Sequence, residues 1–128
     1  MLDCRKLEVY QVTLEFVALA RNVSKSVPTG NSDLVNQLKR ASSSILLNTA
    51  EAAGKTGKSD KQKFYSIARG SAMECAAILD LFIILGLIQR DDIAILNELL
   101  ERIIAMLSKL CWSQVGNRER AGARASAR

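Results

Sequence analysis

Apolar residues recur every three or four positions along most of the chain, the spacing that places them on one face of an α-helix. Four such segments cover residues 7–26, 34–55, 60–85 and from about 91 onward. Turn-forming residues separate them, at Pro28, at residues 54–58 and at Gly86. Four helices with short connections predict an all-α protein, an antiparallel up-down-up-down four-helix bundle.

The same spacing predicts the core of this bundle. The expected core residues are Val9, Val12, Phe16, Ala20, Val23, Val27, Leu34, Leu38, Ala41, Ile45, Phe64, Ile67, Ala68, Ser71, Cys75, Ile78, Leu79, Phe82, Ile93, Leu96, Leu100, Ile103, Ile104, Leu107, Leu110 and Cys111. Ser32 with Asp33, and Ser59 with Asp60, are expected to cap the second and third helices.

A polar stripe runs beside the apolar face of the second segment. Its members are Gln37, Arg40, Ser44, Asn48 and Glu51, which fall within about 80° of one another on a helix. We predict that the stripe joins Ser71 and Glu74 of the third segment in a structural polar network. In this interpretation Glu51 and Glu74 pair with neighbouring Arg or Asn side chains and fix the register of the helices. Whether the network lies within the bundle, at a subunit interface or at the surface stays open.

The third segment has a second apolar side, roughly opposite its core face. A monomeric four-helix bundle would leave this side in water, so a partner subunit is the natural cover. Trp112 lies to one side of the fourth segment's apolar face and is expected at the bundle end or in an interface. The predicted oligomer interface therefore consists of Met73, Ala77, Leu81, Ile84 and Trp112.

Composition removes most catalytic chemistry. The 128 residues include no histidine, which excludes His-based acid-base catalysis, Ser-His and Cys-His nucleophiles and most zinc sites. The three cysteines, Cys4, Cys75 and Cys111, are far apart and suggest neither a disulfide framework nor a metal site. Residues 54–59 read GKTGKS, but a phosphate-binding loop needs four residues between its glycines and a preceding strand. We predict no enzyme, no metal and no cofactor.

Positive charge is concentrated towards the C-terminus. Residues 117–128 carry +3 of the net charge of +5 and contain no large apolar side chain. We therefore divide the chain into a bundle over residues 1–116 and a basic, disordered tail over 117–128. The tail is equally well interpreted as a phosphate-binding arm or as a solubilising terminus. The predicted nucleic-acid contacts are Lys39, Arg40, Lys55, Lys58, Arg118, Arg120 and Arg124.

No secretory signal opens the chain, and the longest apolar run is too short to span a bilayer. We expect a soluble cytoplasmic protein without a membrane partner.

The order of residues resembles a known family. The runs QLKRASSSI at 37–45, NTAE at 48–51 and FYSIARGSAME at 64–74 are similar to those of proteins named after intervening sequences of bacterial 23S ribosomal RNA. The opening LEVY at 7–10 fits the same pattern, so the resemblance covers about residues 7–90. It departs from the family at Ala52, where glycine is usual.

The resemblance implies a cytosolic four-helix bundle that assembles as a homopentamer. Members of the family look like accessory nucleic-acid binders. A related branch comprises the accessory variability proteins of diversity-generating retroelements, which bind a reverse transcriptase and its template RNA. Two hypotheses follow: a non-enzymatic, homo-oligomeric binder of RNA or DNA, with a reverse transcriptase as an alternative partner, or a pure protein-interaction scaffold.

Overall fold

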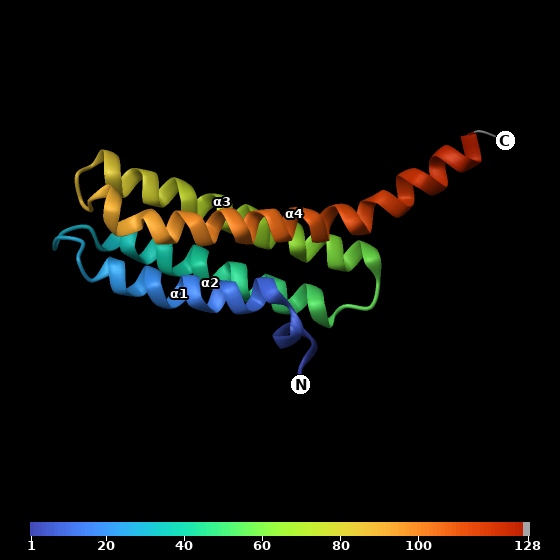
Figure 1. Ribbon diagram of the computed structural model, residues 1–128, viewed down its shortest axis with the longest axis horizontal. Coiled ribbons are helices and arrows are strands. Elements are labelled where there is room, and N and C mark those ends of the chain that lie inside the picture. Colours follow the sequence, from blue (N-terminus) through green and yellow to red (C-terminus); the bar gives the residue numbers. More distant parts are fainter. Residues whose placement is uncertain (127–128) are drawn as a thin grey trace.

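Four long helices and one short 3-10 helix make up the structure, a computed structural model (Figure 1). The structure describes the backbone of residues 1–126 and the side chains of residues 1–113. The elements are η1 (Asp3–Lys6), α1 (Glu8–Ser24), α2 (Ser32–Gly54), α3 (Lys58–Ile84) and α4 (Arg90–Ser126).

The helices form one bundle in which each helix packs against the next and α1 closes the ring by packing against α4. Consecutive helices lie side by side and run in opposite directions (Figure 1). Two side-chain contacts between α3 and α4 fix their antiparallel register: Ser66 with Cys111, and Arg69 with Ser108. The described part of the chain contains no strand, so the predicted all-α four-helix bundle is confirmed.

The core consists mainly of the residues that the apolar spacing selects. Phe16, Ile45 and Phe82 are completely buried, as are Leu79 and Ile103. Burial of a Leu, Ile or Phe side chain stabilises the fold by about 1.5–3 kcal/mol relative to exposure, so these layers hold the helices together.

The core prediction is wrong at Ile67, whose side chain is 42% exposed. The pattern also missed residues that are buried, among them Tyr65 and Leu99. Thr13 and Thr49 are also fully buried, because each hydroxyl donates a 2.7 Å hydrogen bond to the carbonyl four residues earlier in its own helix. A threonine paired in this way packs like a valine.

The helix ends differ from the predicted caps. Asn31 and Gly57 occupy the N-cap positions of α2 and α3, and neither makes a side-chain capping bond, so the caps predicted at Ser32 and Ser59 are wrong. Two connections turn at glycines in the left-handed region, Gly30 at φ 101° and Gly86 at φ 69°. Only glycine adopts that conformation at little cost, which explains both positions.

The C-terminal part of α4 projects past the other helices (Figure 1). Its backbone is helical to Ser126, where the sequence predicts an unfolded tail from residue 117. That residues 117–128 form a basic segment separate from the bundle stays a prediction, and the side chains of Arg118, Arg120 and Arg124 lie outside the described residues.

Candidate functional site

Part of the predicted polar network forms at the contact between α2 and α3. The hydroxyls of Ser44 and Ser71 lie 2.8 Å apart, and Asn48 donates from Nδ2 to Ser44 Oγ at 3.0 Å. Ser71 is buried, with 9% of its surface exposed, and the other two are half-buried. These three side chains therefore link the two helices at one fixed register.

The remaining members of the network stay at the surface. Gln37, Arg40 and Glu74 are exposed, and within the described residues they make no hydrogen bond or ion pair. Glu51 pairs with Lys55 at 3.8 Å, and among the described residues the predicted pairing of Glu51 with Arg or Asn does not form. At this outer edge of the stripe, Gln37 and Arg40 line an open groove of about 850 Å³ on α2, whereas Glu51 and Glu74 are not among its lining residues.

The second apolar side of α3 lies in solvent. Met73 is 45% exposed, Leu81 41% and Ile84 79%, and Ala77 is also exposed. These four positions share one side of α3, because they are three or four residues apart. The structure therefore brings the predicted interface residues of α3 together on an unpartnered surface.

A basic cluster surrounds the connection between α2 and α3. Lys55 and Lys63 each place Nζ over the ring of Phe64, at 5.3 Å and 5.4 Å from its centroid. Lys61 donates to the carbonyls of Ala52 and Ala53 at 3.2 Å and 3.4 Å, which neutralises the negative end of α2. Lys58 is exposed in the first turn of α3. We call Lys55, Lys58, Lys61 and Lys63 the loop lysines.

Lys39 and Arg40 are not part of this cluster. They are exposed on α2, and 16 residues separate Lys39 from Lys55, about 24 Å along the helix. Lys39 instead borders a second groove, of about 490 Å³, between α1 and α2.

Arg21 and Lys25 also line this second groove, and no carboxylate does. Neither residue was identified from the sequence, because neither belongs to a run of adjacent charges. Their spacing of four residues on one helical face is the signal that identifies them. Among the side chains that the structure describes, the loop lysines and the α1–α2 groove are thus two separate basic surfaces.

Two ionisable side chains of the core have raised pKa values. Burial, with a smaller contribution from the charge of Glu74, raises the pKa of Cys75 to about 12. Burial, followed by the charge of Cys111, raises the pKa of Tyr65. A thiol that stays protonated is a poor nucleophile. Among the described residues, no group of His, Cys, Asp and Glu side chains is arranged to hold a metal ion.

A protein-family model, 23S rRNA-intervening sequence protein, matches residues 5–109. The chain belongs to that family. The match confirms the resemblance drawn from residues 37–51 and 64–74. It covers α1, α2 and α3 completely and α4 as far as residue 109.

A solved structure is similar to this one. It is the crystal structure of a protein of unknown function from the S23 ribosomal protein family of Bacteroides thetaiotaomicron. The two chains are 25% identical and superpose with a TM-score of 0.72, over 80% of this chain and 94% of the other. No curated protein matches the chain. None of the helices, over the residues described, is long and apolar enough to cross a membrane.

Proposed function

We propose that this intervening-sequence protein is a non-enzymatic, homo-oligomeric accessory protein that binds RNA or DNA through its basic surfaces. The loop lysines are the observation that carries the proposal. Four lysines lie within nine residues at one end of the bundle, with only Glu51 and Asp60 as nearby carboxylates in sequence. The free N–H groups at the start of α3 add to the positive potential there.

A phosphate backbone fits this chemistry better than a small ligand. Lysines on flexible stems contact phosphates without demanding one geometry, and each contact releases a condensed counterion from the nucleic acid. The α1–α2 groove, with Arg21, Lys25 and Lys39, supports the same proposal because cations line it without a balancing carboxylate. The ribosomal RNA in the family's name agrees with a nucleic-acid partner.

The test measures the binding of a labelled RNA by fluorescence anisotropy at a series of salt concentrations. Affinity should fall steeply with salt, and Lys58→Glu and Lys39→Glu should each weaken binding and reduce the slope of log K against log salt by about 0.7–0.9. Arg90→Glu is the matched control for Lys58→Glu, because Arg90 is exposed beside Asp91 and Asp92 at the end of the bundle opposite the loop lysines. Absence of binding at 50 mM salt, or binding independent of salt, would contradict the proposal.

The homo-oligomer is proposed from the exposed apolar side of α3. A second copy of the chain is the occupant, because this side carries three large apolar side chains, and because Arg40 on α2 and Glu74 on α3 make no ion pair among the described residues. A second copy offers the same charges in complementary form, as well as an apolar surface to bury. The family resemblance implies that the assembly is a pentamer.

Light scattering after size exclusion tests the assembly. Ile84→Glu should dissociate it, whereas Ile95→Glu, which changes a 59% exposed isoleucine on α4, should not. An unchanged mass for Ile84→Glu would show that this side is not the interface.

A pure scaffold is the second candidate, favoured by the exposed outer edge of the polar stripe. In that case Arg40→Ala should alter the mass or the melting temperature before it alters RNA affinity. If Arg40→Ala weakens RNA binding and leaves assembly and stability intact, the scaffold hypothesis is refuted.

A further inference from the structure

Trp112 is the single tryptophan of the chain, and it lies at the surface with 69% of its area exposed. It directly follows Cys111, whose sulfur lies 3.6 Å from the hydroxyl of Ser66 on α3. This contact places Trp112 beside the first half of α3. Ile84 is 18 residues farther along α3 than Ser66, about 27 Å away, so Trp112 is remote from that end of the apolar stripe.

An arginine is anchored one turn before this tryptophan. Arg69 donates from Nε to the hydroxyl of Ser108 at 2.6 Å, and Ser108 is buried, with 8% exposed. Within the described residues no carboxylate pairs with Arg69. The bond to Ser108 uses the inner nitrogen, and the two terminal amino groups of the guanidinium make no hydrogen bond to any residue that the structure describes. An arginine held in this way can donate two parallel hydrogen bonds to a phosphate.

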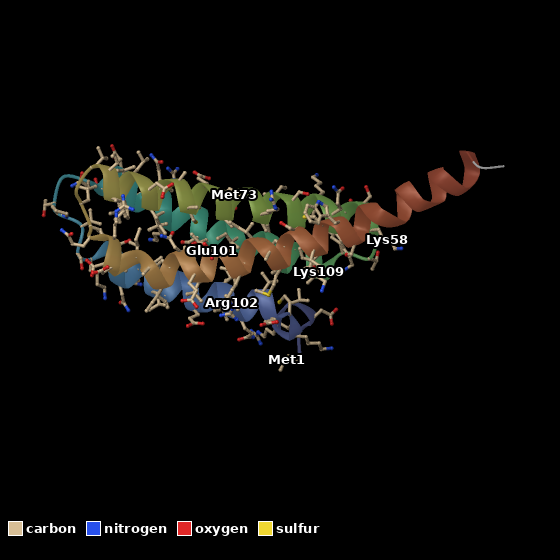
Figure 2. The ribbon with its side chains drawn as sticks, turned by 45° about the horizontal axis from the view of Figure 1, so that its top comes forward. Met1, Lys58, Met73, Glu101, Arg102 and Lys109 are labelled. Carbon is tan, nitrogen blue, oxygen red and sulfur yellow. The ribbon has the colours of Figure 1, made fainter. Side chains whose placement is uncertain are left out.

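Two lysines extend the positive charge around the pair. Lys109 is exposed and lies one turn before Trp112 on α4, and Lys58 is exposed at the start of α3. Figure 2 shows both lysines towards the same end of the bundle, with Met73 farther along α3. An exposed indole with exposed lysines towards the same end of the bundle fits a partner with negative charge and an aromatic face. Unpaired nucleotides have both.

We propose that Arg69 and Trp112 form a binding site for single-stranded nucleic acid, in which an unpaired base stacks on the indole and an adjacent phosphate binds the guanidinium. Ser108 and Trp112 are four residues apart, about one helical turn, a separation that one nucleotide can span. Bases inside a duplex are stacked on each other and cannot reach the indole, so the site selects single strands. This proposal rests on the proposed nucleic-acid function and names its substrate class.

The experiment uses the intrinsic tryptophan fluorescence, because Trp112 is the single tryptophan and every change in tryptophan emission therefore comes from this side chain. Three probes are titrated at low salt: a single-stranded uridine oligonucleotide, an abasic oligonucleotide with the same number of phosphates, and a duplex of the same length. The uridine strand should quench the emission, and the other two should bind with little quenching. The substitution Trp112→Ala should weaken binding of the uridine strand by about 5- to 100-fold and leave the affinity for the abasic strand unchanged. Anisotropy of labelled probes measures both affinities.

Two variants sharpen the result. Trp112→Phe should retain most of the affinity because a phenyl ring still stacks, and Ile95→Ala, which truncates another exposed apolar residue of α4, should have no effect. Equal affinity of the wild type and Trp112→Ala for the uridine strand would overturn the stacking site and leave the proposed function standing. A change in oligomer mass in Trp112→Ala would overturn it in favour of a subunit interface. Failure of the wild type to bind any of the three probes would refute the proposed function itself.

Discussion

The hydrogen bond between Ser44 and Ser71 should stabilise the bundle by a measurable coupling energy. An intramolecular hydrogen bond contributes about 0.5–1.5 kcal/mol net. The 2.8 Å distance and the burial of Ser71 favour a full contribution, so we expect a coupling of about 1 kcal/mol in a double-mutant cycle of Ser44→Ala and Ser71→Ala. Each serine-to-alanine change also raises helix propensity by about 0.5 kcal/mol, and the cycle cancels this gain.

The two single variants should differ. Ser71→Ala leaves Ser44 Oγ with its bond from Asn48, whereas Ser44→Ala removes the partner of the buried Ser71 hydroxyl. Loss of a partner for a buried polar group costs about 1–3 kcal/mol, so Ser44→Ala should be the more destabilising change. At about 2.1 cal/mol/K per residue of unfolding entropy, 1 kcal/mol shifts the melting temperature by about 4 °C.

Urea denaturation followed by circular dichroism measures the cycle. Protein concentration must be held constant, because the stability of an oligomer depends on it. The control cycle pairs Ser43→Ala with Ser71→Ala, since Ser43 donates only to the carbonyl of Lys39 and should show no coupling to Ser71. A Ser44–Ser71 coupling within about 0.3 kcal/mol of zero, the limit of simple additivity, would refute the assignment of the register to this bond.

Two further predictions concern the thiols. Ellman's reagent should modify Cys4 quickly in the native protein and leave the buried Cys75 and Cys111 unmodified until unfolding, so rapid reaction of three thiols would contradict the packing. The free energy of unfolding should decline as pH rises from about 9 to 12, because the unfolded thiol of Cys75 ionises near its ordinary pKa of 9.0 while burial keeps the folded thiol protonated to a pKa of about 12. Cys75→Ala should reduce the slope of that decline by at most about 1.4 kcal/mol per pH unit. Urea denaturation at several pH values across this range measures the slope, and equal slopes for the wild type and Cys75→Ala would contradict the prediction.

The fold could be predicted from the sequence because its signals are local and repeated. Every turn of each helix adds another apolar residue to the same stripe, so an error at one position does not change the assignment. Ile67 shows the limit of this reasoning. It lies at the edge of the apolar stripe, where burial depends on how closely α2 approaches, and the neighbouring Tyr65 is buried instead.

The candidate site was harder to predict because it depends on contacts between helices. Ser44 and Ser71 are 27 residues apart, and helical periodicity places each on its own helix without giving their register. The bond from Arg69 to Ser108 spans 39 residues and has no signal in either segment alone. Charge counting located Lys55 and Lys58 because they are close together in sequence. It missed Arg21 and Lys25, which join Lys39 only through the packing of α1 on α2.

Different parts of α3 carry different kinds of exposed or anchored side chain. Its first turn carries Lys58, its middle directs Arg69 towards α4, and the side from Met73 to Ile84 faces solvent. Subunit contacts made through that apolar side would leave the basic end of every bundle free. In a ring of identical subunits the Arg69–Trp112 site would then recur once per subunit, so a strand long enough to reach two sites would bind the second one intramolecularly. Oligomerisation would therefore convert a weak single-nucleotide site into a tight binding site for longer single strands. The apolar side of α3 and the Arg69–Trp112 site would in this way contribute to one function.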